Sequence, residues 1–435
     1  MGQSINNNFL RVVGRRELKG TVKISGNKNA ALPAIAATLL TDETVILENL
    51  PNIIDVQVML EIAEALGVDV NYDKKRNCAE LTAKNIKTSD ISRHLCAKIR
   101  TSVLFTAPLV VRCQKVTLWP PGGDIIGRRR LDGHFYGLQG LGVEVLCETL
   151  PYQFKAPKRL HGKELFLDEA SVTATEQIML AAVLADGVTI LRNAASEPHV
   201  IDLGVLLNKM GARINGLGTN TLTIEGVKKL HGTSHEIVSD HIETGSFIAL
   251  GSALNSELTI ENITPGHYWM MHRVFERLGV HFSIDKNKIF LPSNQELKVQ
   301  KDFGNAIPTI ADGPWPQFPS DMMSCTIVTA TQAEGTVLFF EKMFESRLYF
   351  VDRLISMGAN AISCDPHRVV ISGVSQLRGV EMSSPDIRAG MALLIAAMTA
   401  YGESTIRQVS MIQRGYENLI EKLQKIGAAI ELKSE

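Results

Sequence analysis

A tripeptide made of a large apolar residue, a glycine and a small apolar residue recurs six times along this chain. The copies are Leu66-Gly67-Val68, Leu141-Gly142-Val143, Met210-Gly211-Ala212, Leu278-Gly279-Val280, Met357-Gly358-Ala359 and Ile426-Gly427-Ala428. Each copy follows a segment with helical spacing of apolar residues, and glycine commonly ends a helix. Intervals of roughly 68 to 79 residues are too long for solenoid repeats and suit a βαβ-type unit in several copies. Six units predict an α/β protein of two three-unit domains, with a ligand-binding cleft between them.

Length and charge narrow the possible classes of protein. The chain has 435 residues, which predicts two or three domains with sizeable cores. Its 45 basic and 46 acidic residues nearly cancel, which argues against a nucleic-acid partner or a polybasic membrane anchor. The cysteines are scattered and form no CxxC pair, which argues against disulfides and zinc sites. They are Cys78, Cys96, Cys113, Cys147, Cys325 and Cys364.

Neither the first residues nor the apolar runs of the sequence indicate secretion or a membrane-spanning segment. Residues 1–8 have neither the basic nor the apolar region of a signal peptide. Asn6 stands where an N-myristoylation motif needs Ser or Thr. The apolar runs are too short to span a bilayer. We therefore expect a cytoplasmic protein with no membrane partner.

The first unit shows the plan that the others repeat. The sequence predicts a strand at Val22–Ile24, a buried helix from Ala30 to Leu40 and a second strand at Glu43–Glu48. A second helix, Asp55 to Leu66, should end on Gly67 with a positive φ angle.

The other five units follow the same order of elements. Their first helices are expected to begin near Lys98, Ser171, Glu243, Ser320 and Asp386. Their middle strands are expected at Lys115–Leu118, Val188–Leu191, Glu257–Ile260, Thr336–Phe339 and Ser404–Ile406. The apolar scaffold repeats, whereas the polar residues at the first helix of each unit differ.

Cations at helix starts are the unusual part of that variation. Ser, Thr and Asp at these places have an ordinary explanation as N-caps. Capping does not explain Lys28, Arg100 or Arg388, because the helix dipole opposes a cation at the N-terminus. A multiply charged anion bound there would explain them.

A glycine-rich segment, Pro120–Asp132, interrupts the second unit. It combines two prolines and several glycines with the three consecutive arginines Arg128, Arg129 and Arg130, and with Asp124. One interpretation is a mobile lid that closes over phosphate groups. The alternative is a solvated surface loop, which is the usual fate of an arginine-rich turn. Asp124 favours the lid, since a carboxylate beside cations and glycines can lie close to a ligand.

Three further charged residues lie at comparable places in the fifth and sixth units. Asp321 is at a predicted helix start, and Arg347 and Arg414 follow the middle strands. Each has an ordinary alternative as a helix-terminal or surface charge. The histidines His134, His199, His241 and His272 lack metal-ligand spacing, so we expect no metal and give His134 at most a supporting role.

Five segments together resemble a known family, the UDP-N-acetylglucosamine enolpyruvyl transferases (1-carboxyvinyltransferases). They are Ser25–Pro33, the Pro-Gly-Gly-x-x-Ile-Gly-x-Arg segment at 121–129, Phe318–Met322, Asp386–Arg388 and Arg414–Glu417. The resemblance runs in order over nearly the whole chain. The related shikimate-pathway transferases fit less well, because the second unit lacks a Gly-Asn-Ala-Gly-Thr stretch.

The resemblance implies a fold and a reaction. The fold would be a two-domain inside-out α/β barrel with pseudo-threefold domains at 23–235, carrying the mobile loop around 119–132, and at 1–22 plus 236–435. The active site would lie in the cleft between them. The enolpyruvyl group of phosphoenolpyruvate would pass to the sugar 3-hydroxyl of UDP-N-acetylglucosamine, through a tetrahedral ketal and with release of phosphate. This is the first committed step of peptidoglycan synthesis, and it needs neither a metal nor an organic cofactor.

The same resemblance implies roles for individual residues. Phosphoenolpyruvate would be held by Lys28, Asn29, Arg129, Arg347, Arg388 and Arg414. The nucleotide sugar would be held by Arg100, Arg129, Arg130, Leu131, Asp132, Gly133, Ser171, Val172, Asp321 and Met343. The catalytic residues would be Asp124, Asp321, Lys28 and Arg414. Asp321 would accept the proton of the attacking hydroxyl, and Asp124 would protonate the methylene carbon.

Several positions depart from the family pattern on the nucleotide-sugar side. They are Arg130, where proline is usual, Glu169 (lysine), Thr173 (glycine), His241 (arginine) and Trp315 (histidine). A transferase that uses a different nucleotide sugar or another hydroxyl acceptor is therefore the alternative. A non-catalytic sensor of nucleotide sugars is a third hypothesis, disfavoured because a sensor needs no phosphoenolpyruvate site.

The loop residue Asp124 generates a testable prediction. Most of the family have a cysteine here, which fosfomycin alkylates, so the resemblance implies that this chain is intrinsically resistant. Asp124→Cys should retain turnover and become sensitive, because it restores the nucleophilic thiol. Time-dependent loss of phosphate release and the mass of the protein measure this. A stoichiometric fosfomycin adduct on the unchanged protein at Asp124 would contradict the prediction.

Overall fold

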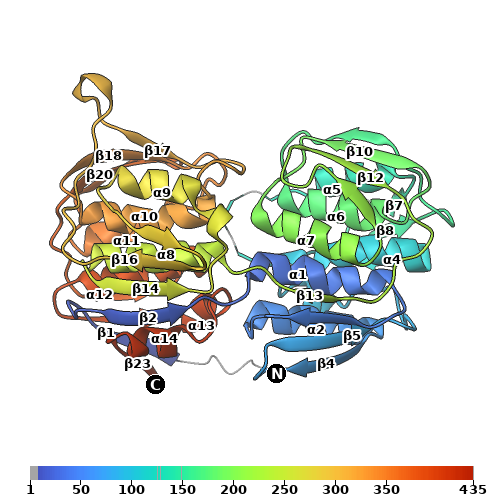
Figure 1. Ribbon diagram of the computed structural model, residues 1–435, viewed down its shortest axis with the longest axis horizontal. Coiled ribbons are helices and arrows are strands. Elements are labelled where there is room, and N and C mark those ends of the chain that lie inside the picture. The colour runs from blue at the N-terminus through green and yellow to red at the C-terminus, as the bar shows by residue number, and fades with distance from the viewer. Residues whose placement is uncertain (1–7, 125, 128, 148, 435) are drawn as a thin grey trace. The chain divides into compact units, whose positions relative to one another are not determined.

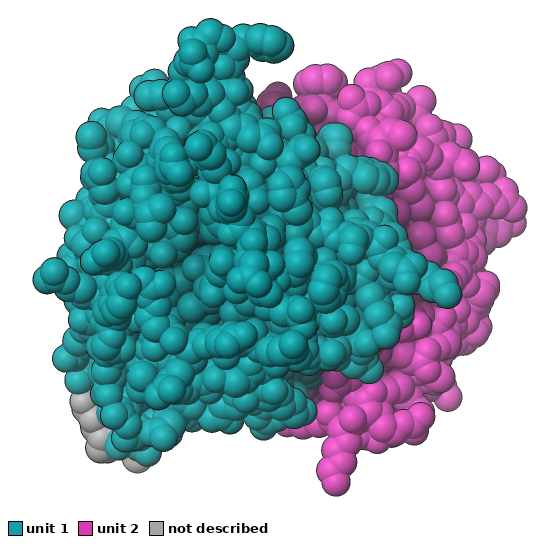
Figure 2. Space-filling view, turned by 60° about the vertical axis from the view of Figure 1, so that its left-hand side comes forward, with its two compact units in different colours: residues 1–25, 125–128, 239–435 teal, residues 26–124, 129–238 magenta. Residues whose placement is uncertain are grey.

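The computed structural model describes residues 8–124, 126–127, 129–147 and 149–434. The predictions made for residues 1–7 and for Arg128 lie outside these ranges. The chain forms two compact units (Figure 2). Unit 1 consists of Met1–Ser25, Ile125–Arg128 and Ser239–Glu435, and unit 2 of Gly26–Asp124 and Arg129–Val238. The predicted domains at 23–235 and at 1–22 plus 236–435 stay a prediction, since compactness does not test independent folding.

The described part of unit 1 contains three four-stranded sheets. Their strands are β1 (Asn8–Val13), β2 (Lys19–Lys23), β14 (Glu257–Glu261), β15 (Ser283–Asp285), β16 (Lys288–Leu291), β17 (Thr309–Ala311), β18 (Gly335–Phe340), β19 (Ala361–Asp365), β20 (Arg368–Gly373), β21 (Glu381–Ser383), β22 (Glu403–Arg407) and β23 (Ala429–Ser434). The orders are β21-β22-β1-β23, β15-β16-β14-β2 and β17-β18-β20-β19. Strand β1 runs antiparallel to both β22 and β23, so both ends of the chain contribute to one sheet.

The helices of unit 1 are interspersed among these strands along the chain. The α-helices are α8 (His241–Ala253), α9 (Trp269–Glu276), α10 (Ser320–Thr331), α11 (Val351–Ser356), α12 (Ile387–Thr399), α13 (Val409–Gln413) and α14 (Leu419–Lys425). Short 3₁₀ turns are η3 (Pro265–His267) and η4 (Phe303–Asn305).

The described part of unit 2 contains two four-stranded sheets and one three-stranded sheet. Their strands are β3 (Val45–Glu48), β4 (Asp69–Asp73), β5 (Cys78–Thr82), β6 (Lys115–Leu118), β7 (Glu144–Cys147), β8 (Tyr152–Lys155), β9 (Glu164–Phe166), β10 (Val188–Arg192), β11 (Arg213–Asn215), β12 (Thr221–Glu225) and β13 (Ser234–Glu236). The orders are β13-β3-β5-β4, β11-β12-β10-β9 and β6-β8-β7. The α-helices are α1 (Lys28–Ala37), α2 (Ile54–Leu66), α3 (Arg93–Cys96), α4 (Thr106–Cys113), α5 (Asp132–Gly140), α6 (Val172–Ala182) and α7 (Pro198–Lys209), and the 3₁₀ helices are η1 (Thr38–Leu40) and η2 (Arg100–Phe105).

One pairing pattern recurs in the sheets. In each four-stranded sheet the middle strands β3, β10, β14, β18 and β22 pair in parallel with an edge strand on one side and antiparallel with a strand on the other. In the three-stranded sheet, an isolated parallel bridge from Asp90 to Thr117 of β6 takes the place of the edge strand. These middle strands lie where the sequence predicted them.

The central helices lie in the interior of their units, among the strands (Figure 1). Every residue of α8 and α12 is buried, and in α10 every residue except Asp321 is buried. Helices that are apolar on all sides must be covered on all sides. In α1 the one residue not buried is Asn29, and in α6 the residues not buried are Val172 and Thr173. The accessible residues of α1, α6 and α10 are thus confined to the first turn.

The six repeat glycines share one backbone conformation. Gly67, Gly142, Gly211, Gly279, Gly358 and Gly427 all have positive φ, between 78° and 105°. At Gly67 the residue ends α2 in the left-handed region, and its N–H reaches the carbonyl of Glu64 at 2.9 Å. The prediction made for Gly67 is confirmed.

The predicted helix start near Lys98 is wrong. Residues Arg100–Phe105 form the 3₁₀ helix η2, and the α-helix α4 begins only at Thr106. Pro108 explains the start of α4, because proline has no N–H and is tolerated in the first turn, where that N–H has no partner. Arg100 therefore opens a 3₁₀ turn and not an α-helix.

Within the described residues, we find no helix that is both long and apolar enough to cross a bilayer.

A pair of glycine substitutions separates backbone strain from steric clash. Gly279→Ala should lower the free energy of unfolding more than Gly187→Ala, as measured by urea denaturation. Both glycines have positive φ, but a Cβ on Gly279 would lie 2.5 Å from the Lys298 nitrogen, whereas one on Gly187 meets nothing within 4 Å. We expect roughly 1 to 3 kcal/mol for the strain at either site, and a comparable further loss at Gly279. Equal losses would contradict this.

Candidate active site

Asp321 joins two arginines in unit 1, and we call these three residues the arginine cluster. Oδ1 of Asp321 accepts a hydrogen bond from Nη2 of Arg347 at 2.8 Å. Oδ2 accepts from Nε of Arg388 at 2.9 Å, and Nη2 of Arg388 lies at 2.8 Å. Three residues distant in sequence therefore share one ion-paired group.

The arginine cluster has spare donor capacity. Arg347 and Arg388 are only 3 % and 4 % exposed, while the Asp321 side chain is 28 % exposed. Nε of Arg347 and Nη1 of Arg388 are buried and have no hydrogen-bond acceptor among the described residues. Buried donors without acceptors are costly, and guanidinium groups match carboxylates in geometry. The cluster is suited to bind a further anion.

Neighbouring groups fix Arg388 in place. Asp386 caps α12 by accepting hydrogen bonds from the amides of Arg388 and Ala389, at 2.8 and 2.9 Å. The guanidinium carbon lies 5.6 Å from the ring centre of Tyr416. Burial alone would lower the pKa of Arg388, but Asp321, Tyr416 and Asp240 together outweigh it, so that the pKa lies well above its ordinary value.

His241 is an uncharged residue that interacts with the arginine cluster. Burial, with smaller effects from His267 and Arg388, lowers its pKa to about 3. Its ring packs edge-on against Trp315, with ring centres 5.9 Å apart. An uncharged imidazole thus stands where the resemblance implies that arginine is usual.

In unit 2, Lys28 forms a buried ion pair with Asp55. Nζ of Lys28 lies 2.6 Å from Oδ2 of Asp55, and both side chains are at least 90 % buried. Lys28 is the first residue of α1, Asp55 lies in the first turn of α2, and Asn27 caps α1 by accepting from the amide of Ala30. Asp55 offsets the unfavourable placement of a cation at a helix start.

A second basic group in unit 2 surrounds Arg100. Burial lowers the pKa of Arg100 to about 10, with a smaller effect from the charge of Arg129. Nη2 of Arg100 donates to the carbonyl of Arg130 at 2.9 Å. Burial also lowers the pKa of His134 to about 4, so this ring is neutral at pH 7. Its Nε2 lies 3.0 Å from the Thr173 hydroxyl, and the supporting role expected for His134 stays a prediction.

The other residues predicted to bind the nucleotide sugar can each be placed in the structure. Arg130 pairs with Asp132 at the start of α5. Ser171 caps α6 by accepting from the amide of Ala174, which leaves Val172 as the first helical residue. Leu131 is buried and Gly133 packs near Ala174. Met343 is 39 % exposed in unit 1.

Three of the remaining predicted residues are half-buried. They are Asn29, Asp124 and Arg414. Arg414 follows the short helix α13 in unit 1, and the other two belong to unit 2. The roles assigned to all of these residues stay predictions.

The sequence interpretation missed two groups of carboxylates. Asp55 was taken only as a helix start, and Glu341 and Asp312 were not considered. Burial and the neighbouring Asp312 raise the pKa of Glu341 to about 8. An acidic residue at the end of an apolar strand was the only signal, and it does not show which partner such a residue meets. Among the described residues no group of three potential metal ligands occurs.

Comparisons with known proteins agree with each other. The family model for EPSP synthase (3-phosphoshikimate 1-carboxyvinyltransferase) matches residues 12–423. Proteins named UDP-N-acetylglucosamine 1-carboxyvinyltransferase from Treponema denticola and Borreliella burgdorferi are 53 % and 52 % identical to this chain, each over 97 % of it and 98 % of their own length. One from Bradyrhizobium diazoefficiens is 51 % identical, over 97 % of both chains.

Solved structures share the fold at lower identity. The enolpyruvyl transferase NikO from Streptomyces tendae matches with a TM-score of 0.87 and 23 % identity, over 98 % of this chain and 99 % of NikO. EPSP synthase from Acinetobacter baumannii matches with a TM-score of 0.76 and 17 % identity, over 98 % of this chain and all of that one. The predicted α/β class is thus confirmed as the mixed α/β fold of these transferases.

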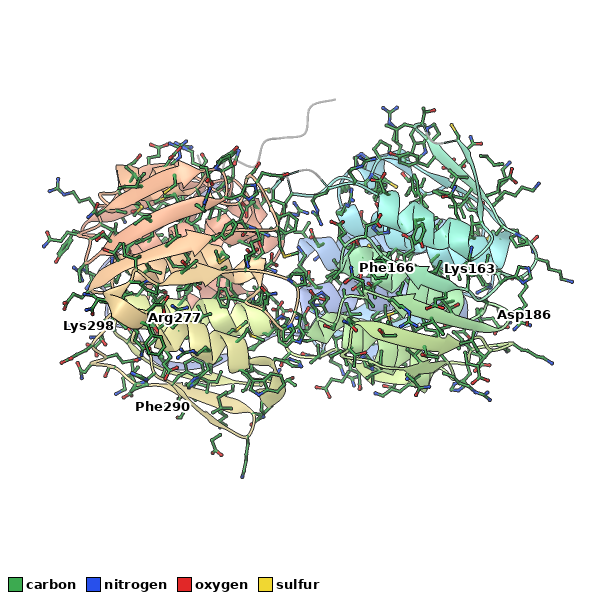
Figure 3. All side chains as sticks on the ribbon, turned by 90° about the horizontal axis from the view of Figure 1, so that it is seen from above. Lys163, Phe166, Asp186, Arg277, Phe290 and Lys298 are labelled. Atoms are coloured by element: carbon green, nitrogen blue, oxygen red, sulfur yellow. The ribbon has the colours of Figure 1, made fainter. Side chains whose placement is uncertain are left out.

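The arginine cluster predicts a large effect on stability. Asp321→Asn should lower the free energy of unfolding by roughly 3 kcal/mol in buffer without phosphate or sulfate, because it leaves two buried cations poorly compensated. Urea denaturation measures this. The control is Asp302→Asn, which removes a surface partner of Arg277 at 2.6 Å (Figure 3 labels Arg277) and should change the value by at most about 1 kcal/mol. Similar losses in both variants would contradict the prediction.

Proposed function

The chain belongs to the EPSP synthase family of enolpyruvyl transferases, and from that premise we propose that it transfers the enolpyruvyl group of phosphoenolpyruvate to the 3-hydroxyl of UDP-N-acetylglucosamine. Relatives that carry the name of this activity match nearly the full length of the chain at 51–53 % identity. The protein is therefore a transferase.

The arginine cluster is the observation that carries the proposal. Phosphoenolpyruvate has a carboxylate and a phosphate, and two buried guanidinium groups with free donors fit the carboxylate. Lys28, Arg129 and Arg414, with Asn29 beside them, would hold the phosphate. The proposal requires cations of both units to act on one substrate molecule.

The catalytic steps use two carboxyl groups. The oxygen of the sugar hydroxyl would attack C2 of phosphoenolpyruvate while Asp321 takes the proton of that hydroxyl. Asp124 would give a proton to C3. The product of this addition is a tetrahedral ketal that still carries phosphate. Loss of phosphate from C2 and of a proton from C3 then restores the double bond. Two guanidinium groups keep Asp321 in the ionised form that a base needs, and 28 % of its side chain is accessible.

The nucleotide sugar would be held mainly by unit 2. The basic group around Arg100 and Arg129 would face the diphosphate, and the start of α6 at Ser171 and Val172 would offer amide groups to it. Glu169 is exposed, so its charge is screened by water and weighs little against an anionic ligand.

The finer structural and cellular features belong to the same proposal. The six sheets would correspond to six repeated units of an inside-out α/β barrel. The enzyme would act in the cytoplasm in the first committed step of peptidoglycan synthesis, with small-molecule substrates, no nucleic-acid or membrane partner and no cofactor. Asp124 in the loop would make it resistant to fosfomycin.

Phosphate release tests the function directly. Purified protein is given phosphoenolpyruvate with and without UDP-N-acetylglucosamine, and the mass of the product is recorded. Release that depends on this acceptor, with a product heavier by one enolpyruvyl unit, is the expected result. Release with another nucleotide sugar but not with this one would instead support the alternative acceptor.

Asp321→Asn tests the proposed base in the same assay. It should lower kcat by about 10²- to 10⁴-fold, the usual contribution of a general base, while phosphoenolpyruvate still binds to Arg347 and Arg388. Binding of phosphoenolpyruvate is followed by calorimetry. A variant that keeps wild-type kcat would exclude Asp321 as the base.

A further inference from the structure

Glu341 is a residue of unit 1 that has no role in the proposed mechanism. It follows the last residue of β18 and is fully buried. A buried carboxyl group is expensive unless its oxygens are satisfied, and here they accept several hydrogen bonds. These bonds lead to two different parts of the arginine cluster.

The first connection runs to the start of α10. The hydroxyl of Ser320 lies 3.0 Å from Oε1 and 2.8 Å from Oε2 of Glu341. Ser320 is the first residue of α10 and directly precedes Asp321. Pro319 at the N-cap position makes no side-chain cap hydrogen bond, so Glu341 and Ser320 anchor this helix end from outside.

The second connection runs to the turn that carries Arg347. Oε1 of Glu341 accepts hydrogen bonds from the amides of Met343 and Phe344, both at 3.1 Å. The carbonyl of Phe344 then accepts from the amide of Arg347 at 3.3 Å. The carboxyl group thus caps the turn from which Met343 and Arg347 project.

We propose that Glu341 is a positioning residue. It fixes the position of the proposed base Asp321 relative to the proposed substrate ligands Arg347 and Met343. The inference rests on the proposed function, because it assigns Glu341 its effect through residues of that site. Through Ser320 it acts on the base, and through the turn it acts on substrate binding. One side chain therefore couples proton removal to substrate position.

A proton on Glu341 is part of this arrangement. The charged and titratable groups around it are Asp312, Arg347 and His367, of which His367 contacts the Glu341 carbonyl at 2.7 Å. Burial and Asp312 raise the pKa of Glu341 to about 8, whereas Arg347 lowers it. The carboxyl group is therefore mostly protonated at pH 7. Its ionisation at higher pH places a second negative charge beside Asp312, and this charge competes with substrate for Arg347.

The pH profile of Glu341→Gln is the first test. Glutamine keeps an acceptor for the two amides and remains neutral, so it mimics the protonated carboxyl group. The ratio of kcat/KM for phosphoenolpyruvate, variant to wild type, should rise about tenfold from about pH 6.5 to about pH 9.5. Groups that titrate in both proteins cancel in this ratio. A ratio that is flat or falls with pH would overturn the proposal.

A matched serine pair tests the connection to Asp321. Ser320→Ala removes the bond to Glu341 and should lower kcat about tenfold, with KM for phosphoenolpyruvate changed less than about threefold. The control is Ser324→Ala, one turn further along α10, whose buried hydroxyl has no hydrogen-bond partner among the described residues. Equal kcat values for the two variants would overturn the proposal.

Stability separates this inference from the proposed function. Because the pKa of Glu341 is raised in the folded state, the folded protein keeps a proton that the unfolded chain has lost between about pH 4.5 and pH 8. The free energy of unfolding of the wild type should therefore fall as pH rises through this range, and more steeply than that of Glu341→Gln. Identical slopes for the two proteins would overturn the inference that Glu341 keeps a proton in the folded state, whether or not turnover is found. Absence of wild-type turnover with these slopes different would count against the proposed function alone.

Discussion

Charge compensation inside an apolar scaffold is the constraint on which this structure depends. Arg347 and Arg388 are nearly completely buried, and a single carboxylate, Asp321, pairs with both. Lys28 is compensated in the same way by Asp55. Isolated buried charges would be too costly, so these three cations need an internal anion before a substrate arrives. In the proposed function the substrate would then bind beside these internal partners or replace them.

The repeated architecture provides the ends at which these charges can sit. Helices such as α8, α10 and α12 are buried on nearly every side, so polar groups are tolerated where the helix begins and free amides need partners. Asp321 and Arg388 both lie in first turns, next to residues that fix the helix end. The chemistry of the proposed site would thus be carried by the starts of helices whose remaining length serves the core.

Second partners determine how precisely the charged groups are held. Asp386 fixes the amide of Arg388, and Glu341 reaches both Ser320 and the turn before Arg347. Removing such a residue changes the geometry of the site without removing a group that would touch substrate. Kinetic constants and pH profiles therefore report on these residues more sensitively than binding does.

The sequence by itself determined the α/β class, the approximate places of the six middle strands and the left-handed glycine at Gly67, because each depends on local periodicity and backbone sterics. It also indicated the cations Lys28 and Arg388 as anomalies at helix starts. It placed a helix wrongly near Lys98, where Pro108 sets the later start. Only the tertiary structure decided that Asp321 bridges Arg347 and Arg388, that Asp55 faces Lys28, and that Glu341 meets Ser320. These pairings join residues from separate elements, and the energy of a buried charge depends on which partner the fold brings within hydrogen-bonding distance.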